Sequence, residues 1–234
     1  EDESSLLANN FTSTHALLAA IKDLTPACRV YFAGSSEMFG DVKNSPQNEF
    51  TPFNPRSVYG ISKLAAFHLA RNYREHHKLF VAAGILYNHE SPRRGHQFVT
   101  RKISATVAKI HLGLADRLEL GNIEALRDWG YAPDYVVAMH AMLQQDNPED
   151  FVISTGLLHT VKDFLIEAFS VVGLNHELYT HINSDHFRPG ETVPLCGDSR
   201  KALEFLDWKP TISFEQLVKE MVLADIERLK GMQK

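Results

Sequence analysis

The strongest constraint on the fold of this chain is a pair of short apolar runs, each of which follows a longer segment with helical periodicity. The runs are CRVYFAGSS at residues 28–36 and FVAAGIL at residues 80–86. A strand that is apolar at almost every position must be covered on both faces, as in a parallel sheet flanked by helices. Helical spacing at 6–24 and from about Ser57 onward supplies that cover. The sequence therefore predicts an α/β fold with a Rossmann-like, doubly wound parallel sheet.

The predicted elements become shorter and more mixed from about residue 88. Further helices are expected at 103–114, 134–145, 161–173 and 213–230, and short strands at 117–121 and 151–156. The proline-rich stretch at 41–56 is expected to be a loop, and the polar, basic stretch at 88–102 leads into the helix expected at 103–114. We therefore expect residues 1–87 to belong to the sheet domain. Residues 88–234 are expected to form mainly a smaller α/β lobe that closes over a binding site, with some segments returning to the sheet.

Composition argues against several classes of function. The 234 residues carry a net charge of -5, so a nucleic-acid partner held by phosphate neutralisation is not expected. The two cysteines, Cys28 and Cys196, are too few for a disulfide scaffold, and the acidic start EDESS does not resemble a secretory signal. No apolar run is long enough to span a bilayer. We expect a soluble cytoplasmic protein without membrane or nucleic-acid partners.

Twelve histidines raise the question of a metal site. His76 and His77 are adjacent and therefore lie on different faces of a helix, and no carboxylate or cysteine stands at ligand spacing beside them. No metal is expected.

The stretch SVYGISK at residues 57–63 places Tyr59 and Lys63 four positions apart at the start of a predicted helix. Residues four apart lie on the same helical face, so the phenol and the ammonium can approach one substrate region. A phenol with a pKa near ~10 becomes a useful base at neutral pH only when a nearby positive charge favours the phenolate. Lys63 would supply that charge, although the spacing alone is a weak signal that more often belongs to two ordinary exposed residues.

The stretch GSSEMFG at residues 34–40 follows a predicted buried strand. Open α/β sheets place their sites at the carboxyl ends of the strands, so Ser35 could hydrogen-bond a substrate oxygen while Glu37 accepts a second proton. The alternative is a serine cap and a solvated loop carboxylate. Gly34 is the first glycine, so no glycine-rich phosphate-binding turn can precede it in this chain.

The combination of GSSE with YGISK resembles the extended short-chain dehydrogenases/reductases. Further sequence motifs, in their order and spacing from about residue 5 to residue 230, resemble the GDP-mannose 4,6-dehydratase family within that group. These motifs are NHESPRRG, FVTRKI, LGNIEALRDWGYAPDYV, MLQQ, FRPGE, GDSRKA and DWKPTISFEQLVKEM. The resemblance implies a lyase that uses NADP, with NAD as an alternative, and converts GDP-mannose to GDP-4-keto-6-deoxymannose. It also implies that residues 1–87 are the C-terminal part of an NADP-binding domain that carries the catalytic residues.

The resemblance also implies roles for single residues. Tyr59 would deprotonate the C4 hydroxyl while Ser35 hydrogen-bonds its oxygen, Lys63 would favour the phenolate and hold the nicotinamide ribose, and Glu37 would take the C5 proton. Ser36 occupies the place where related dehydratases of dTDP-glucose carry an aspartate, so it is assigned to substrate binding. The family usually has threonine where this chain has Ser35, a change that keeps the hydroxyl.

Two further groups follow from the same resemblance. Those expected to bind the sugar nucleotide, in addition to Ser36, are Asn88, Lys102, Leu120, Gly121, Arg127, Arg188 and Glu191. His89 and Arg94 join Tyr59 and Lys63 at the cofactor, and Arg93 and Arg94 lie in a loop that reaches a neighbouring subunit in similar enzymes. A homodimer or homotetramer is expected. Arginine suits a diphosphate because its guanidinium makes paired, charge-assisted hydrogen bonds.

Other interpretations remain open at this stage. An epimerase or reductase of the same superfamily would share Ser35, Tyr59 and Lys63 but lacks a carboxylate at Glu37, whereas a decarboxylase has the glutamate but lacks the NHESPRRG word. Relative to the family the chain begins about a hundred residues late, by the strand and helix count of the fold. It is therefore expected to be a fragment of an active enzyme, a silent binding or assembly protein, or a chain completed by another polypeptide.

Overall fold

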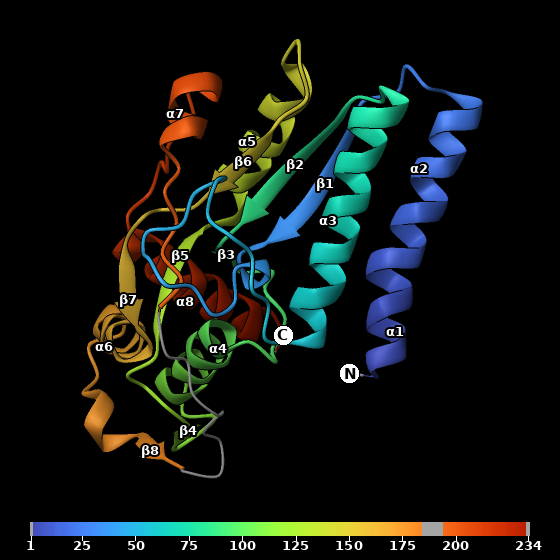
Figure 1. The fold of residues 1–234 in the computed structure, drawn as a ribbon. Helices are drawn as coiled ribbons and strands as arrows, with labels where there is room; N and C mark the ends of the chain where they lie inside the picture. The colour runs from blue at the N-terminus through green and yellow to red at the C-terminus, as the bar shows by residue number, and fades with distance from the viewer. Residues whose placement is uncertain (1, 184–193, 233–234) are drawn as a thin grey trace.

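A three-stranded parallel sheet forms the centre of the molecule (Figure 1). The structure is a computed structural model that describes residues 2–183 and 194–232. Strands β1 (Val30–Ser35), β2 (Val81–Leu86) and β6 (Asp150–Ile153) lie in the order β1-β2-β6, and both pairs are parallel. The two strands predicted from the apolar runs are confirmed, and so is the α/β class.

Helices cover both faces of this sheet. One face is covered by α2 (Ser13–Leu24) and α3 (Val58–His77), with α1 (Glu3–Leu7) against α3, and the other by α5 (Ala132–Gln144) and α7 (Arg200–Leu206). Strand β2 is buried at all six positions. Its side chains alternate: Ala83 and Ile85 join the cluster under α2 and α3, whereas Ala82 and Leu86 join the cluster under α5 and α7. Burial on both faces explains why the strand is apolar throughout.

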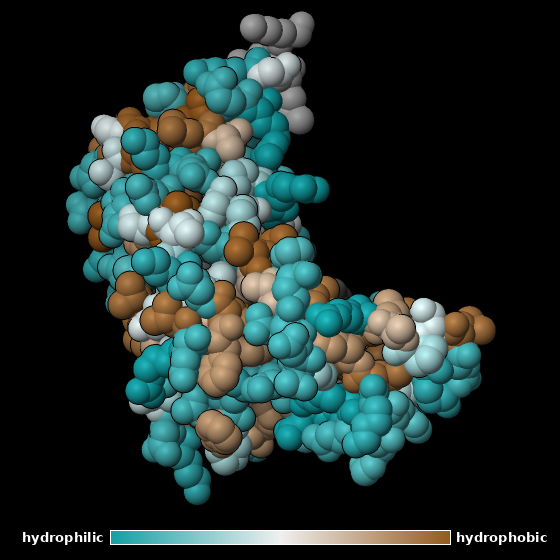
Figure 2. All heavy atoms as spheres, turned by 90° about the horizontal axis from the view of Figure 1, so that it is seen from above, coloured by the Kyte–Doolittle hydropathy of each residue, from teal (hydrophilic) through white to brown (hydrophobic). Residues whose placement is uncertain are grey.

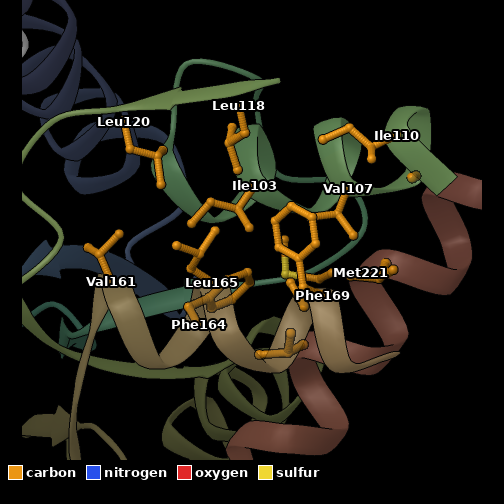
Figure 3. Packing of buried hydrophobic residues seen from close by; sticks show 14 of the residues in the cluster. Ile103, Val107, Ile110, Leu118, Leu120, Val161, Phe164, Leu165, Phe169 and Met221 are labelled. Atoms are coloured by element: carbon orange, nitrogen blue, oxygen red, sulfur yellow. The ribbon is translucent and has the colours of Figure 1, made fainter. Parts of the chain in front are cut away.

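A second core lies beside the sheet and is built from three helices. These are α4 (Val99–His111), α6 (Val161–Val171) and α8 (Phe214–Met232), which pack with the paired short strands β4 (Leu118–Leu120) and β8 (Thr180–Ile182). Figure 3 shows Ile103 and Val107 of α4 facing Leu165 and Phe169 of α6. A buried ion pair between Arg101 of α4 and Asp225 of α8 fastens two of these helices.

Several short elements were not predicted. Strands β3 (Asn88–Glu90) and β5 (Leu126–Tyr131) are parallel partners, and β7 (Leu158–Thr160) pairs with β5 in the antiparallel direction. Strand β3 occupies the start of the basic stretch at 88–102, and α4 begins at Val99, four residues before the expected helix start at 103. Three polar residues such as Asn88–Glu90 carry no periodicity, so only the partner strand reveals them.

The helix predicted at 6–24 is interrupted. A π-helical turn at Ala8–Thr12 separates α1 from α2. Asn9 and Asn10 lie in that turn, and the hydroxyls of Ser13 and Thr14 donate to their carbonyl oxygens. Side-chain bonds of this kind compete with regular helix geometry, which accounts for the local change of winding.

Candidate active site

The predicted catalytic residues gather at the carboxyl edge of the central sheet. Ser35 is the last residue of β1 and lies opposite Leu86, the last residue of β2. The chain then makes a single 3₁₀ turn at Ser36–Met38, and the hydroxyl of Ser35 caps it by accepting a hydrogen bond of 3.3 Å from the amide of Glu37. The Glu37 side chain is exposed, whereas Ser36 is buried. Ser35 and Glu37 therefore reach the same edge, as the spacing predicts.

Helix α3 begins directly against this turn. The Ser57 hydroxyl caps the helix by accepting a bond of 3.0 Å from the amide of Gly60. A Cβ atom at Gly60 would lie 2.6 Å from the carbonyl oxygen of Glu37, closer than side chains approach backbone, so only glycine permits this contact. Tyr59, which precedes Gly60, is therefore held close to the turn that carries Ser35 and Glu37.

Lys63 lies one helical turn after Tyr59 and points back toward β1. Its Nζ atom donates to the carbonyl oxygen of Ala33 at 3.2 Å and lies 5.9 Å from the centre of the Tyr59 ring. Burial lowers the pKa of Lys63 below the ordinary lysine value. Tyr59 itself remains 36% exposed, which leaves its ring open to a ligand. The pair lies on one helical face, as four-residue spacing requires.

A support for this pair was missed from the sequence. Ser62, which lies between Tyr59 and Lys63, is buried and donates its hydroxyl to the Tyr59 carbonyl at 2.8 Å. Asn10 of the π-helical turn donates its amide to the same Ser62 hydroxyl at 3.0 Å. The adjacent asparagines in an otherwise apolar helical stretch were the available signal, because asparagine disfavours a helix interior.

Two predicted ligand-binding residues, Asn88 and His89, follow β2 at the same edge of the sheet. The His89 ring lies 2.9 Å from the carbonyl oxygen of Tyr87 through Nδ1 and stacks on Tyr135 with 4.9 Å between ring centres. A carbonyl only accepts, so Nδ1 carries the hydrogen and Nε2 of the neutral ring is an acceptor. Burial, with a smaller effect of the Arg94 charge, lowers the pKa of His89, which favours this neutral form.

Arg94 is turned inward in this chain. Its Nε lies 3.3 Å from Oε2 of Glu90, and its guanidinium carbon lies 3.5 Å above the Phe98 ring. Thr100 donates its hydroxyl to the same Glu90 oxygen at 2.6 Å. Burial raises the pKa of Glu90, an effect that Arg94 and Thr100 oppose. The neighbouring Arg93 is exposed, so the two arginines of this loop have different environments.

The other predicted nucleotide-binding residues are distributed around the second core. Lys102 is half-buried on α4, and Arg127 of β5 donates to the Leu126 carbonyl at 2.7 Å. Leu120 is buried and points into the core between α4 and α6, so only its backbone and that of Gly121 are available to a ligand (Figure 3). Arg188 and Glu191 lie outside the described residues.

The two most evident cavities lie away from this site. One of about 330 Å³ is lined by charged residues that include Arg71, Arg74 and Lys201, and one of about 170 Å³ lies beside Trp129 and Phe214. Neither is lined by the four predicted catalytic residues.

In the described part of the chain no cluster of histidine, cysteine or acidic side chains could hold a metal ion, and no helix there has the length and apolar character to cross a membrane.

Comparison with known proteins finds one family with which the chain shares most of its length. The family model described as GDP-mannose 4,6 dehydratase matches residues 2–221. The chain is 51% identical to GDP-mannose 4,6 dehydratase 1 of Arabidopsis thaliana over 223 residues, covering 94% of this chain and 62% of the relative. It is 45% identical to the human GDP-mannose 4,6 dehydratase, covering 93% of this chain and 63% of the relative. The chain thus spans about three fifths of the length of these curated relatives.

Solved structures share the fold. The structure of RMD from Pseudomonas aeruginosa complexed with NADPH matches with a TM-score of 0.90 and 23% identity, covering 97% of this chain and 76% of that one. DesIV, a dTDP-glucose 4,6-dehydratase from Streptomyces venezuelae with NAD and TYD bound, matches with a TM-score of 0.84 and 21% identity, covering 98% and 69%. Identity at this level establishes the fold alone.

Proposed function

The chain belongs to the GDP-mannose 4,6-dehydratase family, and from this premise we propose that the protein converts GDP-mannose to GDP-4-keto-6-deoxymannose with NADP as its cofactor. The observation that carries the proposal is the contact of the Gly60 backbone with Glu37. It brings the backbone of Glu37, whose side chain is exposed, to the helix turn that carries Tyr59, with Lys63 one turn further on. An oxidation at one carbon followed by removal of a neighbouring proton requires two such groups, a base for the hydroxyl and a base for the carbon acid.

The first half of the proposed reaction is oxidation at C4. Tyr59 removes the proton of the C4 hydroxyl, and the Lys63 ammonium, 5.9 Å from the phenol ring, favours the phenolate that can do so. Ser35 donates a hydrogen bond to the C4 oxygen. A nicotinamide cofactor held beside Lys63 would supply reversible hydride transfer between C4 and C6, so that no cofactor would be consumed overall.

The second half is elimination of water. A ketone at C4 makes the C5 hydrogen acidic, and Glu37 would remove that proton and pass it to the departing C6 hydroxyl, which leaves as water. The product is complete once C6 has received the hydride and C5 a proton from solvent, while Tyr59 gives the C4 proton to solvent. The exposed position of Glu37 beside Ser35 supports this role, because the carboxylate is open to a ligand at the strand end. Related epimerases need no such carboxylate, so Glu37 favours dehydration over epimerisation.

The residues at the sheet edge are compatible with a nicotinamide cofactor. Only one of the three N–H groups of Lys63 is needed for the Ala33 carbonyl, so the ammonium can also donate to ribose hydroxyls. The Nε2 acceptor of the neutral His89 ring suits a carboxamide donor. The Arg94 guanidinium lies against Glu90 and Phe98. It would have to break both contacts before it could bind a cofactor phosphate within its own subunit. NADP is favoured by the NADPH complex of RMD, whereas NAD in DesIV keeps that cofactor as the alternative.

The sugar nucleotide would lie between the sheet edge and the second core. Its proposed ligands among the described residues are the side chains of Ser36, Asn88, Lys102 and Arg127 and the backbone of Leu120 and Gly121. Arg188 and Glu191, which lie outside the described residues, are also proposed as ligands. Residues 1–87 would hold the cofactor side and residues 88–234 mainly the substrate side, although β6, α5 and α7 return to the sheet. We expect a cytoplasmic homodimer or homotetramer in which the exposed Arg93 faces a neighbouring subunit.

The decisive variant for the proposed function is Glu37→Gln. It keeps the size and exposure of the side chain but removes the base for C5, so elimination should fall by about 100-fold or more, which starts at the lower end of the range for a general base. Oxidation at C4 should persist, and reduced nicotinamide should therefore accumulate up to one equivalent per site. Mass spectrometry of the sugar nucleotide and near-ultraviolet absorbance report the two steps separately.

The exposed Glu75 on α3 offers a matched control. Glu75→Gln makes the same chemical change far along the helix from Tyr59 and should leave turnover unchanged. Normal formation of the keto-deoxy sugar by Glu37→Gln would remove Glu37 from the mechanism, and a wild-type protein that does not convert GDP-mannose would refute the proposed function.

A further inference from the structure

The side chain of Gln47 is buried, although its position in the sequence suggests an exposed loop residue. It lies in the polar, proline-rich stretch between β1 and α3, yet it is 0% exposed. Its side-chain amide donates to the carbonyl oxygen of Asn44 at 2.9 Å, and its side-chain carbonyl accepts from the Tyr87 hydroxyl at 2.8 Å and from the Cys196 amide at 3.0 Å. Buried polar groups are retained when they are fully hydrogen-bonded, and here each contact joins Gln47 to a different segment or turn.

The backbone of Gln47 holds the same distant segment. Its N–H donates to the Cys196 carbonyl and its carbonyl accepts from the Asp198 amide, both at 2.8 Å. Gln47 and Gly197 thus form an isolated parallel β-bridge, with residues about 150 positions apart in the chain facing each other. The Cys196–Asp198 segment is fixed along one side by a single residue.

Asp128 holds this segment from the other side. Its buried carboxylate accepts from the Gly197 amide at 3.1 Å and also from the amides of Thr155 and Gly156, at 2.9 and 3.0 Å. A Cβ atom at Gly197 would lie 2.3 Å from the Ser154 hydroxyl and 2.8 Å from the Tyr87 ring. Gly197 therefore lies in a closed slot with Tyr87 as one wall.

Tyr87 connects this arrangement to the proposed site. Its hydroxyl donates to the side-chain carbonyl of Gln47, and its amide donates to the Ile153 carbonyl at 3.0 Å. Its own carbonyl accepts from the His89 ring. The next residue is Asn88, a proposed ligand of the sugar nucleotide. We propose that Gln47 is a positioning residue that fixes Tyr87 and thereby sets where Asn88 and His89 meet their ligands; this inference rests on the proposed function.

The chemistry of the buried amide explains why an apolar side chain would not serve. In Gln47→Leu the buried Tyr87 hydroxyl and the part-buried Cys196 amide lose their acceptor. The buried hydroxyl costs free energy when it is left unpaired, and the chain can relieve that cost by moving Tyr87. Movement of Tyr87 shifts Asn88, whereas Tyr59 and Glu37 are held by Gly60 and Ser57 in separate contacts.

The test is calorimetric titration with GDP, which keeps the nucleotide half of the substrate and is not converted, combined with steady-state kinetics on GDP-mannose. Gln47→Leu should weaken GDP binding about tenfold and raise KM for GDP-mannose by a similar factor, with kcat within about twofold of the wild type. Tyr87→Phe, which removes only one hydroxyl, should weaken GDP binding about threefold. The double variant should be no weaker than Gln47→Leu, because both changes break one connection.

The exposed Gln144 at the end of α5 provides a matched control, and Gln144→Leu should leave every value unchanged. All measurements are made well below each thermal midpoint, so that a loss of stability alone does not alter affinity. If Gln47→Leu does not fold, Tyr87→Phe decides: weaker GDP binding supports the inference, and wild-type binding overturns it. Wild-type affinity in both variants, or an equal loss of kcat and affinity, also overturns it. A wild-type protein that binds no GDP refutes the proposed function and the inference together.

Discussion

At the residue scale, the site depends on where buried polar groups find partners. Lys63 loses solvent but gains the Ala33 carbonyl, and the pKa of Lys63 is lowered because burial disfavours its charged form. The ammonium should therefore be lost at a lower pH than that of an ordinary lysine. Since the phenolate of Tyr59 needs that charge, turnover should begin to fall on the alkaline side at a lower pH than an exposed lysine would cause.

Glu49 gives a stability prediction at the same scale. Its carboxylate covers the outer edge of β6 by accepting a bond of 2.7 Å from the Val152 amide. Burial raises the pKa of Glu49, and the Val152 amide and Lys201 only partly oppose this. A carboxyl whose pKa is raised by folding binds its proton more tightly in the folded state, so its charged form destabilises the protein above that pKa.

Glu49→Gln should therefore be more stable than the wild type at neutral pH, because the amide oxygen can still accept from Val152 without a buried charge. The advantage should shrink as the pH falls through the raised pKa, where Glu49 itself becomes neutral. Urea unfolding at several pH values measures both free energies of unfolding. An advantage that grows toward acid pH would contradict the assigned direction of the shift.

The spacing of functional residues was readable from the sequence at this scale, but their supports were not. Ser35, Glu37, Tyr59 and Lys63 meet at one edge because strand ends and four-residue helical spacing have fixed geometry. Gln47 in contrast lies among polar, proline-rich residues and resembles a solvated loop side chain. Its burial depends on Tyr87 and Cys196, which are 40 and 149 positions away in the chain.

At the element scale, long elements with strong periodicity and the short apolar strands β4 and β6 were predicted, whereas the other short strands were not. The strands β1 and β2 and the helices α3, α6 and α8 follow from apolar runs and helical spacing. Strands β3, β7 and β8 have three residues each and carry no pattern of their own. They exist because a neighbouring strand supplies their hydrogen bonds, and that information lies elsewhere in the chain.

The junction between the 3₁₀ turn and α3 makes a testable prediction at this scale. Gly60→Ala would place a Cβ atom 2.6 Å from the Glu37 carbonyl oxygen, so the turn and the helix must separate. We expect a loss of about 1–3 kcal/mol in the free energy of unfolding. We also expect kcat to fall by about tenfold or more, because Tyr59 and Glu37 would no longer share one geometry.

Gly231→Ala near the end of α8 is the matched control, since a Cβ atom there meets nothing within 4 Å. It should leave kcat unchanged and should not lower stability, because alanine is the better helix former. A Gly60→Ala variant with wild-type kcat would show that close contact between the turn and α3 is not needed for the reaction.

At the scale of the whole molecule, the sheet and the second core have different proposed roles in the reaction. The sheet edge carries the groups proposed to move protons, and three of the proposed nucleotide ligands, Lys102, Leu120 and Gly121, lie on or beside the second core. Helix α2 lies at one side of the molecule in Figure 1, and its Leu17 and Leu24 are exposed. Figure 2 shows hydrophobic side chains in brown among hydrophilic ones over much of the face in view. The lobes follow from the sequence only in outline, because α5, β6 and α7 return from the second half of the chain to the sheet.

The measurement that addresses the proposed chemistry most directly follows one hydrogen. GDP-mannose labelled with deuterium at C4 is incubated with the protein and NADP in ordinary water, and the product is analysed by NMR. Hydride transfer from C4 to C6 within one site predicts that the deuterium appears at C6, that C5 carries hydrogen from solvent, and that no reduced cofactor accumulates. Return of the deuterium to C4, its loss to solvent, or recovery of unchanged GDP-mannose would contradict dehydration at this site.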